Sequence, residues 1–229
     1  MDGCVIRPIA HIESDFPAKF GIPRQAGLVE ALEARIVFEP EYRNPDALRG
    51  LEGFSHIWLI WQFSEAVRDD WSPTVRPPRL GGNTRMGVFA TRSPFRPNAL
   101  GLSCVRLLAV EREGKDGPAL KVAGADLMNG TPIFDIKPYV PYADCRPEAS
   151  GGFAPEAEAR LTVAFSGQSR ENIPAEKLCA LTGVLENDPR PRYQKDAQRV
   201  YALEFAGMEI KFSVSDGLLT VVSADRKQK

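Results

Sequence analysis

The sequence predicts a mainly β protein in which a small β-barrel domain, residues 1–146, precedes a small α+β domain, residues 158–229. In the first part of the chain, short β-branched and aromatic runs alternate with loops rich in proline and glycine, and few segments show a helical period. Such a series of short strands favours a closed or partly closed barrel. A shift in composition at residues 146–158 indicates a linker, and a helix and a hairpin are predicted beyond it.

The first strands are predicted at residues 5–12 and 34–38, with a loop at residues 16–28, which carry two prolines and two glycines. A helix is expected at residues 45–51, because Asn44 and Pro45 suit the N-cap and the first helical position. Residues 53–63 are almost continuously apolar, which fits a strand buried on both faces. Periodicity alone also allows a buried helix there, and the aromatic and β-branched bias favours the strand.

The β pattern continues to the end of the predicted barrel and returns after the linker. Residues 73–83 and 93–98 are predicted loops, again because of their prolines and glycines. Further barrel strands are predicted at residues 86–91, 102–110, 120–124 and 133–136. The second domain is predicted to hold a strand at 159–165, a helix at about 174–185, a hairpin of 200–205 with 209–214, and a last strand at 218–222.

Composition excludes several classes of protein. The 229 residues are 43% hydrophobic and 26% charged, with a formal net charge of −1. No apolar run approaches the ~20 residues of a membrane span, and Met1-Asp2-Gly3-Cys4 lacks the start of a signal peptide, so we expect a cytoplasmic protein. The four cysteines and two histidines are not spaced as zinc ligands, and no metal is expected. The glycine motifs of P-loop and Rossmann sites are absent, as is G-x-S-x-G.

Positive charge is concentrated in one stretch, residues 75–107. Residues 71–110 contain no Asp, Glu or Lys and carry a formal charge of +6. A local cationic block in a chain of nearly balanced charge indicates a site for an anion. Because every cation is arginine, bidentate recognition of phosphate or carboxylate is favoured. The six are Arg76, Arg79, Arg85, Arg92, Arg96 and Arg106.

Three polar motifs in the barrel domain could carry chemistry. Residues 92–98 (R-S-P-F-R-P-N) are stiffened by two prolines and suit a preorganised polar site, with pairing of the arginines to distant acids as the alternative. Residues 126–132 (D-L-M-N-G-T-P) are predicted to turn. Alternation would place Asp135, Lys137 and Tyr139 on one face, as either an acid/base group or a buried network.

Two further motifs each allow two interpretations. His56 lies in the apolar run F-S-H-I-W-L, where a histidine is more often a hydrogen-bonded core residue than a catalytic base. Residues 188–195 (D-P-R-P-R-Y-Q-K) combine three cations with an aromatic ring in a proline-rich loop. That mixture can bind RNA phosphates and stack a base. An ordinary solvated loop is the alternative.

Taken together, these motifs resemble the TsaA/TrmO family of tRNA methyltransferases over nearly the whole chain. They are K-F-G-I-P-R-Q (19–25), G-L-E-G-F-S-H-I-W-L-I (50–60), the stretch 75–98, D-L-M-N-G-T-P (126–132), D-I-K-P-Y (135–139) and D-P-R-P-R-Y (188–193). The last motif resembles the longer, two-domain bacterial members. The resemblance implies an S-adenosylmethionine-dependent enzyme on a small β-barrel that methylates N6 of threonylcarbamoyl-adenosine beside the anticodon of threonine tRNA. It also implies a homodimer with the cofactor near the subunit interface.

The resemblance also implies which residues contact the cofactor: Pro23, Arg24, Gln25, Phe63, Ser64, Arg92, Leu100, Asp126, Leu127, Asn129, Gly130 and Thr131. The chain departs from the family pattern at three places. Ser64 stands where relatives often carry His, and Ala99-Leu100 replaces a usual Pro-Ile. Asn129 replaces a usual Asp, which removes a charge that could pair with the cofactor.

Methyl transfer from a sulfonium chiefly requires that N6 is aligned with the methyl group and that water is excluded. Because the acylated N6 is weakly nucleophilic, a base is useful, and the candidates are Asp135, Tyr139 and His56. The tRNA backbone would be bound by Arg76, Arg79, Arg85, Arg96, Arg190, Arg192 and Lys195.

Two alternatives come from other functional classes. Ser64 and Asn129 suggest an RNA-binding β-barrel module without methyl transfer, and cofactor binding distinguishes that module from the enzyme. Methylation of a small metabolite would leave the cationic stretch without a purpose, unless that metabolite were strongly anionic.

Overall fold

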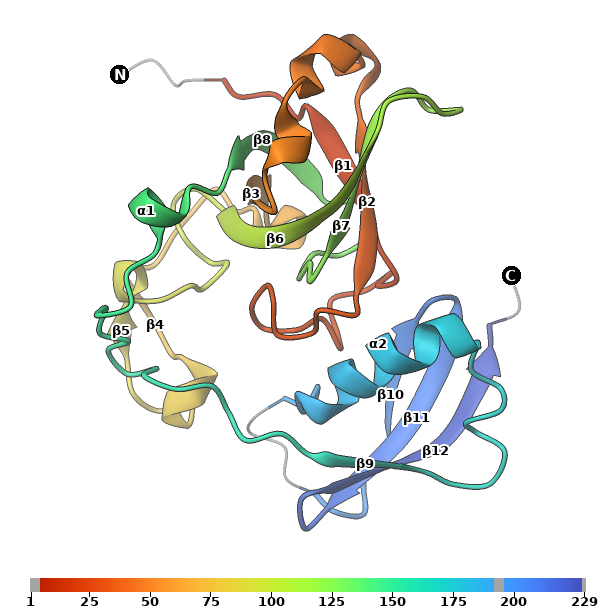
Figure 1. Cartoon of the computed structure of the whole chain (residues 1–229). Coiled ribbons are helices and arrows are strands. Elements are labelled where there is room, and N and C mark those ends of the chain that lie inside the picture. Colours follow the sequence, from red (N-terminus) through yellow and green to blue (C-terminus); the bar gives the residue numbers. More distant parts are fainter. Residues whose placement is uncertain (1–4, 192–195, 228–229) are drawn as a thin grey trace.

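The computed structural model describes residues 5–191 and 196–227, and its two parts are each built on a sheet (Figure 1). The first is a closed barrel with the strand order β1-β2-β7-β6-β3-β8. Its strands are β1 (Ala10–Glu13), β2 (Glu33–Phe38), β3 (His56–Gln62), β6 (Leu100–Glu111), β7 (Ala119–Ala123) and β8 (Pro132–Pro138). The predicted fold class, mainly β with a barrel first and a small α+β part second, is confirmed.

The second part is a four-stranded sheet in the order β10-β11-β12-β9, on which one helix packs. Its elements are β9 (Thr162–Phe165), α2 (Ala175–Glu186), β10 (Tyr201–Phe205), β11 (Met208–Ser215) and β12 (Leu218–Arg226). Ala206 and Gly207 join β10 to β11 with φ of 50° and 76°. Two positive φ angles are what a two-residue turn needs to match the twist of a hairpin, so the predicted hairpin is confirmed.

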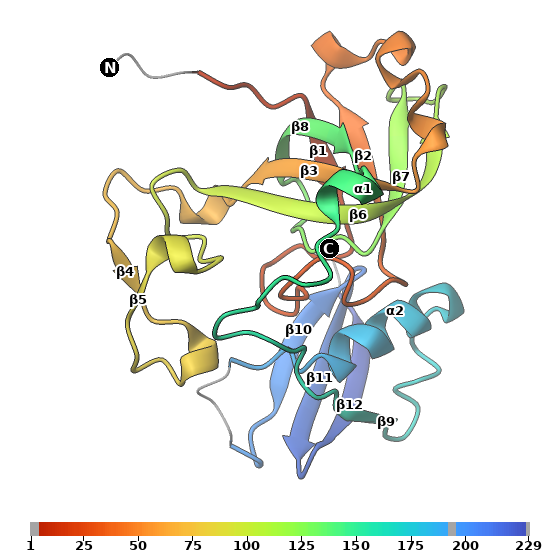
Figure 2. The same ribbon diagram turned by 60° about the vertical axis from the view of Figure 1, so that its left-hand side comes forward.

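Between β3 and β6, the chain leaves the barrel as a lobe, residues 64–99 (Figure 2). The lobe holds the short strands β4 (Thr74–Val75) and β5 (Met86–Gly87) and several 3₁₀ turns. The predicted strand at 86–91 is therefore too long, because Val88–Ala90 turns back as a 3₁₀ helix. After β8, the short helix α1 (Pro141–Asp144) leads into the linker.

Two predictions for the first fifty residues need correction. The first strand begins only at Ala10, since Val5 and Ile6 are 85% and 52% exposed and lie outside the sheet. The predicted helix after Asn44 is a single 3₁₀ turn, Pro45–Leu48. Its cap is as expected, because the Asn44 side chain accepts a hydrogen bond from the Asp46 amide at 3.0 Å.

The prediction that residues 53–63 form a strand buried on both faces is half wrong. They do form β3, in which Ile57, Leu59 and Trp61 point into the barrel core. His56, Trp58, Ile60 and Gln62 alternate with them and are only half-buried. A closed barrel has a single interior, so its strands bury one face fully. The apolar side chains at the outward positions of β3, Trp58 and Ile60, therefore lie on the outer surface of the barrel.

The segment 14–32 connects the two parts of the molecule (Figure 1). It is a loop, as predicted, but Phe16, Val29 and Leu32 are buried in the core of the second sheet. The Phe16 ring meets that of Phe205 edge-on at 5.3 Å. Lys177 of α2 forms a salt bridge with Asp15 at 2.6 Å. The same segment carries the P-R-Q turn, so the second sheet supports one wall of the site described next.

Candidate functional site

A cavity of about 1090 Å³ lies where the barrel, the lobe and the segment 14–32 meet. This volume suits a ligand of nucleoside size or larger. Nine of the residues predicted to contact the cofactor line it: Pro23, Arg24, Gln25, Phe63, Ser64, Arg92, Leu100, Asp126 and Thr131. Several further lining residues were not predicted from the sequence, including Trp58, Trp61, Phe89, Phe95, Gly101, Ser103 and Cys104. One place thus gathers side chains from five separate segments.

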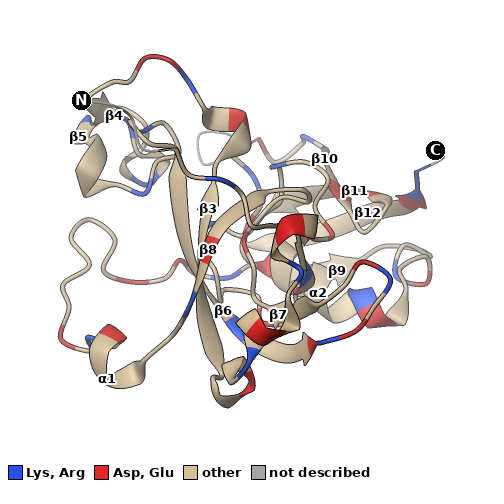
Figure 3. Ribbon diagram, turned by 90° about the horizontal axis from the view of Figure 1, so that it is seen from above, with Lys and Arg blue, Asp and Glu red and all other residues tan. Residues whose placement is uncertain are grey.

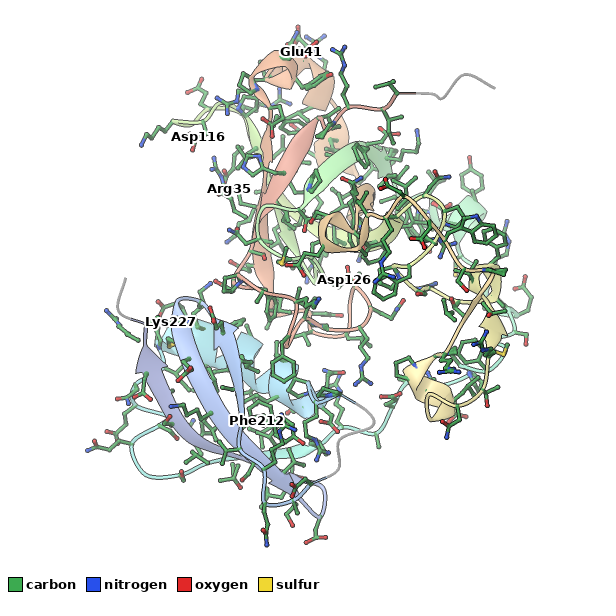
Figure 4. The ribbon with its side chains drawn as sticks, turned by 180° about the vertical axis from the view of Figure 1, so that it is seen from behind. Arg35, Glu41, Asp116, Asp126, Phe212 and Lys227 are labelled. Atoms are coloured by element: carbon green, nitrogen blue, oxygen red, sulfur yellow. The ribbon has the colours of Figure 1, made fainter. Side chains whose placement is uncertain are left out.

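The floor of the cavity is a hydrogen-bonded chain that runs from the buried Trp61 and Ser103 to the half-buried Asp126. The Trp61 indole Nε1 donates to Ser103 Oγ at 2.9 Å, and Ser103 Oγ donates to Asp126 Oδ1 at 2.6 Å. Burial raises the pKa of Asp126, because it disfavours the charged form, while the Ser103 hydrogen bond and the charge of Arg92 oppose this shift. Asp126 lies at the end of the barrel beside the segment 14–32 (Figure 4). A cationic ligand group would stabilise its carboxylate.

Gly101 makes room for this floor. It lies opposite Trp61 in the β3–β6 ladder, and a Cβ atom at residue 101 would come within 2.3 Å of the Trp61 ring. The indole can therefore lie against β6 only because residue 101 is glycine. Held in this way, Trp61 packs edge-on against Phe63, with 4.3 Å between ring centroids. The two rings form an aromatic wall of the cavity.

Two loops meet over the cavity through Gln25. Arg92, in the T-R-S-P loop, donates to Gln25 Oε1, and Gln25 Nε2 donates to the carbonyl of Arg24. Arg24 lines the cavity, but its guanidinium points to the second part of the molecule and pairs with Glu158 at 2.8 Å.

The 126–131 turn is held from behind by the segment 14–32. Asn129 Oδ1 accepts from the Ser14 amide at 3.0 Å, and the Asn129 amide donates to the Phe16 carbonyl at 2.8 Å. Leu127 is buried in the barrel core, and Gly130 supplies the positive φ of 77°. These three residues shape the turn and do not line the cavity. A neutral amide oxygen is sufficient for the acceptor role of Asn129, so the loss of charge there does not weaken the turn.

The three predicted bases lie away from the cavity lining. Asp135 Oδ2 pairs with Lys137 at 3.0 Å on the outer face of β8, which confirms that these two side chains share a face. The Tyr139 ring lies 6.2 Å from that of His56 and 5.8 Å from that of Trp58. Burial, followed by the neighbouring Cys145 and Cys104 thiols, raises the pKa of Tyr139. A phenol with a raised pKa is less readily ionised, so even less of Tyr139 is the phenolate that could accept a proton at neutral pH.

The arginines of the lobe leave positive charge uncompensated. Arg76 and Arg85 are exposed, Arg79 donates to the linker carbonyl of Glu156, and Arg96 donates to the Thr91 carbonyl at 3.2 Å. Over residues 5–191 and 196–227, none of these side chains forms a salt bridge. Basic positions accordingly mark the loops around β4 and β5 (Figure 3). The alternative interpretation of residues 92–98, in which Arg92 and Arg96 pair with distant acids, is not met among the described residues.

The second predicted group of cations behaves differently. Arg190 donates to Asp188 through Nε at 2.8 Å and Nη2 at 2.9 Å, and its side chain is only 14% exposed. Its charge is therefore largely paired within the loop. Arg192 and Lys195 lie outside the described residues.

Two absences hold for the part of the chain that the structure describes. No cluster of three or more His, Cys, Asp or Glu side chains there could bind a metal ion. None of its helices is long and apolar enough to cross a membrane.

Comparison with known proteins gives consistent matches along both parts of the chain. Residues 11–145 match the family model of the tRNA-methyltransferase O N-terminal domain, and residues 153–227 match that of the TrmO C-terminal domain. A tRNA (adenine(37)-N6)-methyltransferase of Escherichia coli K12 is 42% identical over 217 residues, which cover 91% of this chain and 92% of that protein. A putative S-adenosylmethionine-dependent methyltransferase RcsF of Pseudomonas aeruginosa is 43% identical over 199 residues, 83% of each chain. A crystal structure of TrmO from Pseudomonas aeruginosa has a TM-score of 0.78 at 32% identity and covers 97% of this chain and 99% of that one.

Proposed function

Because the chain belongs to the tRNA-methyltransferase O family, we propose that it is a cytoplasmic enzyme that methylates N6 of adenine 37 in tRNA with S-adenosylmethionine. The relatives' names supply the position and the atom. The finer substrate, threonylcarbamoyl-adenosine in threonine tRNA, is proposed from the resemblance of the sequence motifs. The observation that carries the proposal is the cavity that joins an aromatic wall to a half-buried carboxylate, beside a lobe of unpaired arginines.

The residues of the cavity fit S-adenosylmethionine chemically. That molecule carries a positive sulfonium and an ammonium group, and Asp126 offers a carboxylate that lacks a direct cationic partner among the described residues. Trp61 and Phe63 offer rings against which an adenine can stack. Bound there, S-adenosylmethionine supplies an electrophilic methyl group. The chain's own contribution is to align the acceptor nitrogen and exclude water.

The three predicted bases, Asp135, Tyr139 and His56, are not among the residues that line the cavity. We therefore propose that positioning of the acceptor nitrogen against the methyl group carries most of the catalysis. Equilibrium binding of S-adenosylmethionine to the purified chain separates the enzyme from the runner-up, an RNA-binding β-barrel module. Binding supports the enzyme, and its absence supports the module.

The lobe is the surface we propose for the tRNA backbone. Replacing Arg76 and Arg85 together by glutamate should lower tRNA affinity, because each phosphate contact that is lost removes the release of condensed counterions. The slope of log affinity against log salt should fall by about 1.8, roughly 0.9 for each phosphate. Arg49→Glu serves as the control, because Arg49 is exposed and follows the 3₁₀ turn Pro45–Leu48, outside the lobe. An unchanged slope in the double variant would remove the lobe from the tRNA interface.

We propose that the chain forms a homodimer through the outer face of β3 and β6. Leu102 is 60% exposed, and its cross-strand partner Ile60 and the nearby Trp58 point the same way. Leu102 and Trp58 also line the cavity, so a second copy on this face would close it. Leu102→Lys should convert the dimer to a monomer in sedimentation velocity, since it places a charge at the centre of the contact. Leu108→Lys, on the same strand, should leave the dimer intact.

A further inference from the structure

The loop after α2 is held rigid by an internal ion pair. Asp188 adopts the left-handed conformation, with φ 47°, which aspartate tolerates better than most residues and which ends the helix. Its carboxylate accepts both Arg190 guanidinium bonds as well as one from the Arg190 amide at 3.3 Å. Burial alone would raise the pKa of Asp188, yet its hydrogen bonds and pairing with Arg190 hold that pKa below its ordinary value. The backbone carbonyls of this loop are thereby fixed in place.

Those carbonyls receive a side chain from the other part of the molecule. Arg24 Nη2 donates to the carbonyls of Arg190 at 3.1 Å and Asp188 at 3.5 Å, while its Nη1 pairs with Glu158. Burial lowers the pKa of Arg24, a sign that its charge is partly withdrawn from water. A guanidinium has five donors in a rigid fork, so several acceptors at once fix its orientation.

On its other side, Arg24 is bonded into the cavity. Its carbonyl accepts from Gln25 Nε2, and Gln25 Oε1 accepts from Arg92. Arg92 in turn acts electrostatically on Asp126. One connected set of contacts therefore runs from the loop after α2 to the carboxylate at the cavity floor.

From this geometry we propose that Asp188 and Arg190 are positioning residues for cofactor binding. Their ion pair presents the carbonyls that hold Arg24, and Arg24 sets the P-R-Q turn and Gln25 against Arg92. The second domain thus acts on the cofactor site itself, through the contacts of Arg190 and Asp188 with Arg24. The inference rests on the proposed function in one respect, namely that the cavity binds S-adenosylmethionine.

The test is calorimetric titration of the full chain with S-adenosylmethionine. Asp188→Gly removes the carboxylate and keeps a residue that adopts the left-handed backbone without strain. Asp216→Gly is the matched control, because Asp216 is also left-handed, with φ 50°, but lies in the exposed turn between β11 and β12. Affinity should fall about tenfold in the first variant, as expected for a charge-assisted contact, and stay unchanged in the control.

A double-mutant cycle separates positioning from general destabilisation. If the effect passes through Arg24, Asp188→Gly should weaken cofactor binding in the unaltered chain and add nothing in an Arg24→Met background. Arg190→Met, with Arg170→Met as its control, provides a second pair should Asp188→Gly fold poorly. Equal affinities of the unaltered chain and the loop variants would overturn this inference alone. Failure of the unaltered chain to bind S-adenosylmethionine would overturn the cofactor assignment and this inference together.

Discussion

Asp126→Asn is expected to weaken S-adenosylmethionine binding by about ten- to a hundredfold while leaving the fold at least as stable. The carboxylate is the anionic group on the cavity floor, and an amide of the same shape keeps the Ser103 hydrogen bond but loses attraction for a cation. A charged hydrogen bond contributes about 1.5–3 kcal/mol, which corresponds to this range of affinity. Titration calorimetry measures the loss.

The stability of the same variant tests the cause independently. Because burial raises the pKa of Asp126, the folded chain binds this proton more readily than the unfolded chain does. Stability is therefore lost as the pH rises from the unfolded pKa through the folded one. At neutral pH, the free energy of unfolding of Asp126→Asn should be higher than that of the unaltered chain. This difference should disappear near pH ~4, where the carboxyl group is protonated in both the folded and the unfolded chain. Asp225→Asn, an exposed control, should show no such pH dependence. If Asp126→Asn were less stable than the unaltered chain at neutral pH, the charged Asp126 carboxylate would not destabilise the fold as proposed.

Gly101→Ala is expected to damage both the fold and the site. The added Cβ would lie 2.3 Å from the Trp61 ring, so the indole has to move and its hydrogen bond to Ser103 is lost. Overpacking of this kind costs about 1–3 kcal/mol. Urea unfolding should show that loss, and cofactor binding should fall in parallel because Phe63 and Asp126 lose their support.

The control for this substitution is Gly53→Ala, where a new Cβ meets nothing within 4 Å. Its unfolding free energy should stay close to that of the unaltered chain. If Gly101→Ala were as stable as Gly53→Ala and bound S-adenosylmethionine normally, the close approach of Trp61 to β6 would not be what shapes the cavity.

The barrel could be predicted because its signals are local. Prolines and glycines punctuate short runs such as residues 34–38 and 120–124, and both runs are strands of the barrel. The lengths of the strands, and which of their faces point into the barrel, were harder to predict. An aromatic run like 53–63 does not reveal that only one of its faces meets the core, because that depends on closure of the sheet by distant strands.

The site residues that belong to motifs with a family resemblance could be predicted. Those brought together by contacts between distant segments of the chain could not. Trp61, Ser103 and Asp126 meet through the register of β3 and β6, which the sequence does not specify. The local signal in the sequence was alternation along residues 101–105, which places Ser103 on the same face of the strand as Gly101 and Val105. Likewise, the charge of Arg190 suggested RNA binding, and only the fold reveals its pairing with Asp188.

Nucleoside mass spectrometry tests the proposed methyl transfer most directly. tRNA from cells that lack this protein would be digested and analysed before and after incubation with the purified chain and S-adenosylmethionine. The proposal predicts that threonylcarbamoyl-adenosine gains one methyl group, with no gain on unmodified adenosine. An unchanged nucleoside profile, in a preparation shown to bind S-adenosylmethionine, would contradict the proposed substrate.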